Sequence, residues 1–402
     1  MSRMRRLLLA AAGACLLAGC VRVNIHGQPP APAPLRVATY NVSLYDEQAG
    51  GLLRRLQAGD EGARKVAAVL QRVRPDIVLL NEFDHVADGS AADLFQRAYL
   101  EVPQPGGGPA LRYRHRYFAP VNTGVPSGLD LDRNGRVGGE GRERGNDAWG
   151  YGLHPGQYGM LVLSRHPIDH SAVRSFRLLR WSAMPDARMP RDPTTGAPWY
   201  PPETWSRLRL SSKAHWDVPV RTPHGTVHLL AAHPTPPVFD GPEDRNGARN
   251  FDEIRLWAEY LSPGNEDWLC DDAGRCGGLP AQARFVVAGD YNADPYDGDS
   301  VPGAIDQLLG HPRIDARFVP RSAGAAARAA AYGLPRRGDP AAHTGDFGPR
   351  TGTLRLDYVL PSRGLAVLDG GVWWPPPGTP AAAIAEGSDH RLVWLDLRAV
   401  PD

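Results

Sequence analysis

The sequence carries almost no net charge. Its 45 lysines and arginines nearly balance 44 aspartates and glutamates, which gives +1 with neutral histidines. Without residues 1–19, which include three arginines, 42 basic residues face 44 acidic ones and the net charge becomes −2. Proteins that bind nucleic acid regardless of its sequence depend on a strong positive field. The balance therefore disfavours that class of protein, although a local basic groove stays open.

Long apolar stretches are also scarce. The clear one, Leu7–Leu17, follows a cluster of arginines and is too short to span a bilayer stably, which is typical of a signal peptide. It ends in Leu17-Ala18-Gly19-Cys20, a tetrad that resembles a bacterial lipobox. The resemblance implies removal of residues 1–19 and acylation of Cys20. An ordinary cleaved signal with an incidental cysteine is the alternative.

The lipobox resemblance also implies a location. The mature protein is expected to be lipid-anchored in the bacterial cell envelope, in the outer membrane or facing the periplasm. Val21 after the cysteine favours the outer membrane if the source has one. Residues 20–34 end in alternating proline and alanine, a stiff tether of ~3 Å per residue. The sequence therefore predicts a membrane as one partner of this chain, and a monomer is expected.

Cysteine is rare, with four in the chain. Cys15 and Cys20 belong to the amino-terminal segment, which leaves Cys270 and Cys276 for the folded part. In an oxidising compartment these two are expected to form a small local disulfide loop. A metal site is less favoured because no other cysteine or nearby histidine completes one.

Several apolar segments end in a polar residue. The composition, 42% apolar with 45 glycines and 39 prolines, supports a sizeable core with many loops rather than a helical bundle. Short strands are expected at about 36–41, 77–80, 226–232 and 285–289, with a helix at about 60–74 that Pro75 stops. The polar residues that follow these strands are Asn41, Glu82, His233 and Asp290. Their placement predicts a shared catalytic rim at one edge of the sheets.

The segment after the last of these strands is the most informative. Gly289 lets the backbone turn so that Asp290 and Asn292 emerge at the carboxyl end of the strand. Asp290 can act as a general base for water, with Asn292 as an orienting amide. A turn in which the aspartate merely caps the strand is the alternative reading of this stretch alone.

A set of motifs in order resembles the endonuclease/exonuclease/phosphatase superfamily, which includes deoxyribonuclease I, abasic-site endonucleases, sphingomyelinases and inositol polyphosphate 5-phosphatases. The resemblance covers residues 36–398 and implies one domain, over 35–400, of the α/β (α+β) class. Its expected architecture is a four-layer sandwich, in which two packed mixed β-sheets are flanked by helices. The motifs are Tyr40-Asn41, Asn81-Glu82-Phe83, Gly159 to Arg165, Ala232-His233-Pro234, Gly289 to Pro295, Leu356 to Pro361 and Ser388 to Arg391.

The resemblance also implies roles. Hydrolysis of a phosphate ester needs a hard cation on the phosphoryl oxygens, and Glu82, Asn41 and Asp389 are the expected ligands of Mg²⁺ or Mn²⁺. His390 would neutralise the charge that develops on phosphorus, kept protonated by Asp357. His233 resembles a second histidine of the deoxyribonuclease branch, which contacts phosphate or assists the leaving group.

Three further features are less specific. Abasic-site endonucleases place an aspartate where this chain has Ser43, which speaks against that branch. Arg245 and Arg249, in a loop before a helix expected from about Phe251, are candidates for binding a phosphate, and a solvated acid–base pair is the alternative. A calcium loop is suggested by the spacing of Asp130, Asp132 and Asn134, but the twelfth position is Gly141 rather than Glu.

The sequence thus predicts a metal-dependent phosphoester hydrolase that acts outside the cytoplasm. The near-neutral charge and the membrane tether favour a small or lipid-linked phosphate as substrate. An extracellular nuclease of the deoxyribonuclease I type is one alternative, with nucleic acid as its partner. A catalytically silent binding protein on the same scaffold is another.

Overall fold

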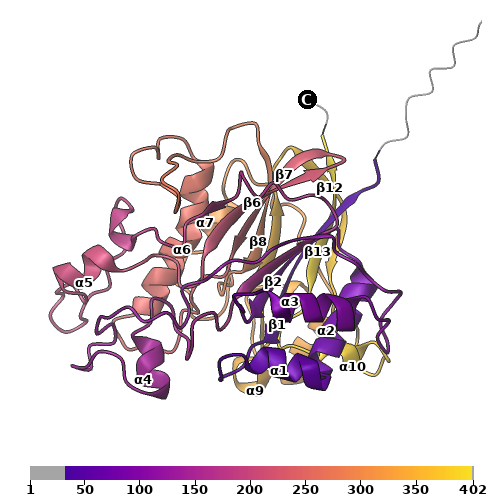
Figure 1. Ribbon diagram of the computed structural model, residues 1–402, viewed down its shortest axis with the longest axis horizontal. Coiled ribbons are helices and arrows are strands. Elements are labelled where there is room, and N and C mark those ends of the chain that lie inside the picture. Colours follow the sequence, from indigo (N-terminus) through magenta and orange to yellow (C-terminus); the bar gives the residue numbers. More distant parts are fainter. Residues whose placement is uncertain (1–31, 401–402) are drawn as a thin grey trace, which may run out of the picture. The chain divides into compact units, whose positions relative to one another are not determined.

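Two β-sheets lie face to face at the centre of residues 32–400, the part of the chain that this computed structural model describes (Figure 1). The first sheet has the order β12 (Leu365–Val372), β13 (Val393–Ala399), β1 (Leu35–Leu44), β2 (Ile77–Phe83), β4 (Met160–Ser164) and β3 (His115–Tyr117). The second has the order β11 (Asp357–Pro361), β8 (Arg284–Asp290), β7 (Gly225–Ala232), β6 (His215–Thr222) and β5 (Arg174–Ser175). A short hairpin-like pair joins β9 (Gly345–Asp346) and β10 (Thr353–Leu354).

Each large sheet is mixed and holds one parallel pair. β1 runs parallel to β2 with Asn41 opposite Asn81, and β7 runs parallel to β8 with Ala232 opposite Gly289. The remaining pairings in both sheets are antiparallel. Since β1 and β2 pack against β8, the carboxyl ends of the two parallel pairs provide the polar residues that the sequence placed after its strands.

Alternation along the strands separates the layers. Val37 and Leu79 point into the core between the sheets, where they join Val286 of the opposite sheet, whereas Ala38 and Tyr40 point outward. Because both faces of these strands are buried, their sequences read as nearly continuous apolar runs. The outward faces pack against helices that lie on opposite sides of the sheets (Figure 1): α1 (Gly51–Ala58), α2 (Glu61–Val73) and α3 (Ser90–Phe95) on one, α6 (Arg245–Leu261) and α7 (Asp306–Leu309) on the other.

This arrangement confirms the predicted four-layer sandwich. The helix expected at about 60–74 is α2, and the reason for its bounds is local. The Asp60 carboxylate accepts a hydrogen bond from the Ala63 amide at the first turn, and Arg74 leaves the helix in the left-handed conformation before Pro75.

The start of α6 differs from the prediction. The helix begins at Arg245 rather than near Phe251, so both candidate phosphate-binding arginines lie on its first turns and not in a loop. Gly247 lies inside this helix, where an added Cβ would meet the carboxylate of Asp244.

The connections carry short helices and one covalent link. The predicted disulfide between Cys270 and Cys276 is confirmed. No helix within residues 32–400 has the length and apolar character needed to cross a bilayer. The predictions for the signal peptide, for Cys20 and for most of the tether concern residues outside those described. The remaining helices are η1 (Gln96–Leu100), α4 (Gly141–Asn146), η2 (Trp181–Ala183), α5 (Pro202–Arg207), α8 (Ala323–Tyr332), η3 (Pro340–Ala342), α9 (Gly348–Thr351) and α10 (Ala382–Ala385).

Candidate active site

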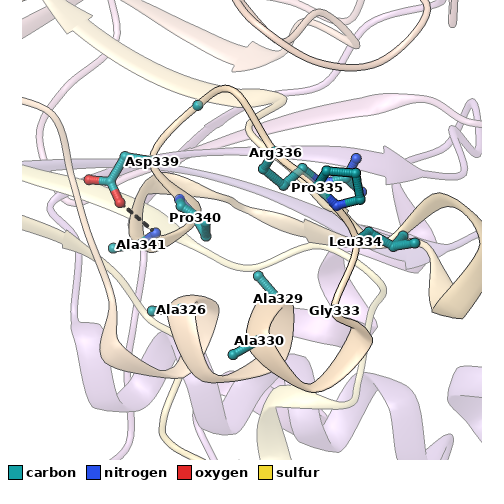
Figure 2. Close-up of a pocket in the computed structure, with 11 residues that line it drawn as sticks. Ala326, Ala329, Ala330, Gly333, Leu334, Pro335, Arg336, Asp339, Pro340 and Ala341 are labelled. Atoms are coloured by element: carbon teal, nitrogen blue, oxygen red, sulfur yellow. Dashed lines mark hydrogen bonds between the residues drawn. The ribbon is translucent and has the colours of Figure 1, made fainter.

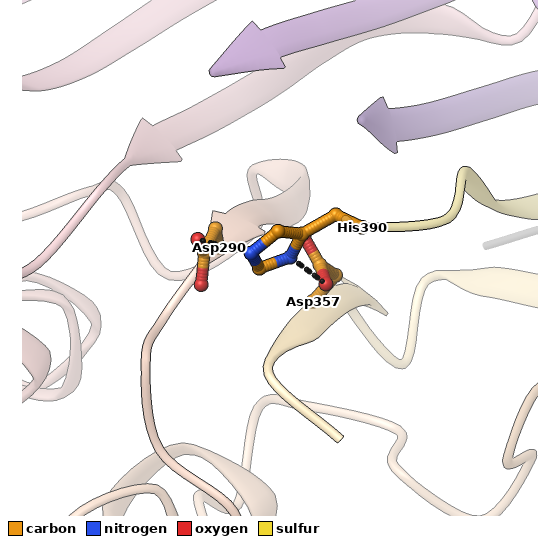
Figure 3. A group of neighbouring side chains, drawn as sticks. All are labelled: Asp290, Asp357 and His390. Atoms are coloured by element: carbon orange, nitrogen blue, oxygen red, sulfur yellow. Dashed lines mark hydrogen bonds and ion pairs between the residues drawn. The ribbon is translucent and has the colours of Figure 1, made fainter. Parts of the chain in front are cut away.

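Asp290, Asp357 and His390 meet between the two sheets (Figure 3). Asp290 ends β8 and lies opposite Asp357 in the β8–β11 pair, while His390 precedes β13 of the other sheet. The Nδ1 atom of His390 lies 2.8 Å from Oδ2 of Asp357, and its Nε2 atom lies 3.6 Å from Oδ2 of Asp290. One imidazole ring thus stands between two buried carboxylates.

Their charges follow from this geometry. Burial by itself lowers the pKa of His390, but Asp357 and Asp290 oppose it and raise that pKa well above the ordinary value. Burial raises the pKa of Asp290 to about 6, against the opposing effect of His390. Near neutral pH the imidazole is therefore a cation and Asp290 an anion, the pairing that a general base and a charge-stabilising group require.

Asn41 and Glu82 extend the cluster toward the first sheet. The amide of Asn41 donates from Nδ2 to Oδ2 of Asp290 over 3.0 Å and also to the carboxylate of Glu82. Burial raises the pKa of Glu82 to about 7, and the negative charges of Asp389 and Asp290 add to this effect. Asp389 is exposed and accepts a hydrogen bond from Oγ of Ser43 over 2.9 Å. The three predicted metal ligands therefore lie in one electrostatic cluster with Asp290.

The backbone around the cluster is strained. Glu82 and Asn292 have φ values of 57° and 51°, in the left-handed region that glycine favours, and Ser43 has 48°. Such conformations persist where the surrounding structure enforces them, and they concentrate at functional sites.

His233 and Asn292 complete the predicted set. The Nε2 atom of His233 lies 3.5 Å from Oδ2 of Asp290, while its buried Nδ1 has no hydrogen-bond partner among the described residues. Burial, Lys213 and His390 lower the pKa of His233 well below its ordinary value, so this ring is neutral. Asn292 donates from its backbone to Oδ1 of Asp290 and from Nδ2 to the carbonyl of Pro234, over 3.0 and 3.1 Å. Its amide thus joins the loops that follow β7 and β8.

The two candidate phosphate-binding arginines are engaged by the protein. Arg249 donates to the backbone carbonyls of Leu210, Trp149 and Arg209. Arg245 forms an ion pair with Glu243. A role in binding phosphate stays a prediction for both.

The suggested calcium loop brings a third carboxylate to the two that were predicted. Asp130 and Asp132 lie close to Asp147. The oxygens of these three carboxylates accept hydrogen bonds from backbone amides of the same loop, and Oδ1 of Asn134 accepts one from Arg136. This arrangement gives no support to calcium binding.

Two residues of the site were not predicted. Thr344 donates from Oγ1 to Oδ2 of Asp357 over 2.6 Å, so that Asp357 is held from both sides. Lys213 is buried just before β6, and burial lowers its pKa while Glu253, Glu82 and Asp290 oppose this. A sequence signal for the lysine existed, because only two of the 45 basic residues are lysines. Thr344 carries no such signal.

A separate hollow lies between α8 and residues 333–341 (Figure 2). Its walls are mainly alanine and proline side chains, with Arg336 and Asp339 as the charged groups, and none of the site residues above lines it. We therefore place the candidate chemistry at the cluster around Asp290.

The family and the fold have known counterparts. Residues 38–390 match the model of the Endonuclease/Exonuclease/phosphatase family. An endonuclease/exonuclease/phosphatase from Beutenbergia cavernae DSM 12333 is 20% identical, with a TM-score of 0.50, over 92% of this chain and 72% of that chain. A family protein from Leptotrichia buccalis C-1013-b is 12% identical, with a TM-score of 0.46, over 90% of this chain and 99% of that one.

A sphingomyelinase C from Streptomyces griseocarneus is 18% identical, with a TM-score of 0.42, over 91% of this chain and 99% of that one. No curated protein sequence matches significantly. The family model spans far more than half of the sequence, and its limits enclose the cluster from Asn41 to His390. The chain therefore belongs to the endonuclease/exonuclease/phosphatase family.

Proposed function

We propose that this chain is a Mg²⁺-dependent phosphoester hydrolase. The observation that carries the proposal is the His390 ring, which lies between Asp357 and Asp290 beside Asn41 and Glu82. Its family includes metal-dependent phosphoesterases and nucleases. A base, a cation and oxygen ligands at one place are the groups that attack of water on phosphorus requires.

The side chains present fit a divalent ion. Glu82, Asp389 and Asp290 repel one another, and the amide of Asn41 is a shared hydrogen-bond donor that cannot neutralise them. Glu82, Asn41 and Asp389 offer hard oxygen atoms, and Mg²⁺ typically takes one or two carboxylates and completes its shell with water. When bound, the ion would polarise the phosphoryl oxygens.

The protein side chains would divide the remaining work. Asp290 takes a proton from the attacking water as the water oxygen forms its bond to phosphorus. His390 donates from Nε2 to a non-bridging oxygen and neutralises the charge that develops there. The bond from phosphorus to the leaving oxygen breaks, with neutral His233 as the hydrogen-bond donor to that oxygen, which is protonated from solvent. Asp357 keeps the His390 ring oriented and charged.

We place the enzyme outside the cytoplasm, anchored through Cys20, with a small or lipid-linked phosphate as substrate. The lipobox-like tetrad and the net charge near zero support this part of the proposal. Cys20→Ala should move the protein from the membrane fraction to the soluble fraction of the source cell. A variant that stays with the membrane would contradict the anchor.

Activity tests the reaction itself. The purified protein with Mg²⁺ is assayed on phosphodiesters, inositol phosphates, plasmid DNA and RNA, beside Asp290→Asn and Glu82→Gln. Loss of the general base should lower kcat by about 100-fold or more. Asp267→Asn, which changes an exposed carboxylate without a partner among residues 32–400, is the matched control. Turnover of DNA alone would favour the nuclease, and no turnover of any substrate would leave a binding protein.

A further inference from the structure

Two polar side chains of α6 hold the chain just after β7. Glu253 and Asn250 lie three positions apart on one face of the helix, and both are fully buried. The backbone amide of Thr235 donates to Oε2 of Glu253 over 2.6 Å, and the carbonyl of Thr235 accepts from Nδ2 of Asn250 over 2.8 Å. Both backbone groups of Thr235, two residues after His233, are therefore bound by the helix.

The same two side chains also reach the neighbouring segments. The backbone amide of Ser212, which lies just before β6, donates to Oε1 of Glu253 over 2.6 Å. Nδ2 of Asn250 donates to the carbonyl of Tyr291, directly after Asp290, over 2.9 Å. The start of β6 and the ends of β7 and β8 are thus tied to one face of one helix, at the edge of the sheet that carries the site.

The packing of α6 does not require these polar contacts. Its apolar side chains already attach it to the second sheet, where Ile254 and Trp257 join Phe285 and Val287 of β8 in one cluster. Glu253 forms no ion pair with any residue in 32–400, so two backbone amides alone satisfy its buried carboxylate. An apolar residue would fill the space without that demand. The carboxylate therefore serves the position of the two segments that it binds.

The position of the His233 ring depends on this backbone. Its Nε2 atom lies 3.5 Å from Oδ2 of Asp290, longer than a good hydrogen bond, and its buried Nδ1 has no partner among the described residues. No close polar contact of the ring therefore fixes it in the site. The path of the chain from His233 to Thr235 does so instead, and that path is held by Glu253 and Asn250.

Glu253 also holds the segment that carries Lys213. This lysine directly follows Ser212, whose amide Glu253 binds. Burial lowers the pKa of Lys213, and Glu253 opposes this effect more than Glu82 and Asp290 do. One buried carboxylate thus contacts the chain next to Lys213 on one strand and close to His233 on the neighbouring strand.

We propose that Glu253, together with Asn250, is a positioning residue for the departure of the leaving group and acts through His233. The inference rests on the proposed function, in which His233 donates to the leaving oxygen. Glu253 does not touch the substrate, because both of its oxygens are bound to backbone amides. Its removal should therefore matter most for a substrate whose leaving group departs with difficulty.

Two methyl aryl phosphates that differ in the leaving phenol test the proposal. Phenol is a weaker acid than p-nitrophenol, so its departure depends more on a hydrogen-bond donor. Glutamine at position 253 keeps the shape but turns an NH₂ group toward one of the two amides. With Mg²⁺, Glu253→Gln should lower kcat/KM by about 10- to 50-fold on methyl phenyl phosphate, and by less than about threefold on methyl p-nitrophenyl phosphate. Glu259→Gln, on the same helix and paired with Arg255 over 2.9 Å, is the matched control and should change neither value.

A double-mutant cycle separates positioning from a general loss of folding. His233→Gln should show the same dependence on the leaving group. The double variant should be no slower on the phenyl ester than His233→Gln alone, within about twofold, because the two residues act as one unit. Losses that multiply would overturn the inference. Glu253→Asp keeps the charge but is too short to reach both amides, so it provides the same test if the glutamine variant does not fold.

The outcomes separate the two proposals. Equal losses of Glu253→Gln on both esters would overturn the inference and leave the hydrolase standing. If the wild-type protein hydrolyses no phosphoester, the hydrolase is overturned. Hydrogen exchange then tests the positioning itself: the amides of Ser212 and Thr235 should exchange at least about 10-fold faster in Glu253→Gln, while those of β8 stay unchanged. Unchanged exchange at these two amides, or faster exchange throughout, would overturn the inference.

Discussion

At the scale of single residues, Asp357 sets the state of the site although it is not expected to touch a substrate. Its Oδ2 atom accepts from both His390 and Thr344, over 2.8 and 2.6 Å, while its Oδ1 has no partner among the described residues. Thr344 also accepts from the backbone amides of Leu356 and Asp357. The threonine hydroxyl is therefore committed to orienting one carboxylate, which in turn orients the histidine.

The Thr344→Val variant should show whether Thr344 orients the catalytic groups, which affects kcat, or binds the substrate, which affects KM. Valine keeps the shape but removes the donor to a charged acceptor, a loss that corresponds to about a 10- to 100-fold fall in kcat. KM should stay unchanged because the substrate does not touch Thr344. Thr344→Ser restores the hydroxyl and should recover most of the activity, and Thr226→Val, at an exposed position of β7, is the control. A serine variant as slow as the valine variant would contradict this role.

His215 lies outside the cluster around Asp290 and allows a test of how folding stability depends on pH. Its Nε2 donates to the Glu253 carbonyl over 2.8 Å and its Nδ1 accepts from Ser211 over 2.7 Å, which leaves the ring neutral. Burial lowers the pKa of His215 from 6.5 to about 4. Between pH 6.5 and about 4 the His215 ring of the unfolded chain binds a proton, whereas that of the folded chain does not. The contribution of His215 to the free energy of unfolding is therefore complete above about pH 6.5 and is lost as the pH falls toward 4. The total loss is about 3 kcal/mol.

Urea unfolding between about pH 4 and pH 7 measures this contribution. The wild-type protein should lose stability toward acid more steeply than His215→Gln, which has no ionisable ring. The variant will be less stable at every pH, and the comparison concerns the slope alone. Parallel pH profiles would show that another group is responsible.

The sequence predicted some of the individual site residues and missed others. Asn41, Glu82, His233 and Asp290 were predictable because each lies at the end of an apolar run in the sequence. Thr344 was not, because its position depends on the path of an irregular loop. Nothing in a local pattern shows that Thr344, 13 positions before Asp357, returns to hydrogen-bond it.

At the scale of elements, the strands were predictable and one helix boundary was not. Strands buried on both faces leave a continuous apolar run in the sequence, which is visible without a structure. The start of α6 was expected near Phe251, about six residues too late. Asp244 has a left-handed backbone just before the helix, and its carboxylate lies where a side chain at position 247 would stand.

Removal of the Cys270–Cys276 disulfide should lower the free energy of unfolding by a limited amount. The bridge closes a loop with a sequence separation of 6, for which chain entropy suggests about 2 kcal/mol. Cys270→Ser with Cys276→Ser should therefore lower the urea midpoint without changing activity at low urea. The buried Asp271, paired with Arg174 and Arg275, should keep the loop folded. A variant that loses activity together with stability would show that the loop supports the site.

At the scale of the whole molecule, the site is a seam between the two sheets. Asn41, Glu82 and His390 come from the first sheet or its borders, and Asp290 and Asp357 come from the second. The fold itself was predictable because its motifs occur in a fixed order along the chain, and the architecture is confirmed. The substrate was not, since the family includes both phosphoesterases and nucleases.

A metal ion bound between the two sheets should stabilise the folded protein as a whole, because it binds the folded state and not the unfolded chain. If Glu82, Asn41 and Asp389 hold Mg²⁺, the ion at 100 times its dissociation constant should add about 2.7 kcal/mol to the free energy of unfolding. Thermal unfolding with Mg²⁺ and with a chelator measures the shift, which Glu82→Gln should abolish and the exposed Asp267→Asn should leave intact. An equal shift in Glu82→Gln would place the ion elsewhere.

The pairing of β1 with β13 also sets the order of assembly during synthesis. Leu35 lies opposite Leu397, and Asn41 and His390 contribute to one cluster from opposite ends of the sequence. A chain still being made can form β1, β2 and their helices, but it has no His390 and no strand to cover that edge of β1. The cluster therefore comes into being in a single late event, after nearly the whole chain has left the ribosome. A partly made chain carries the scaffold without its chemistry.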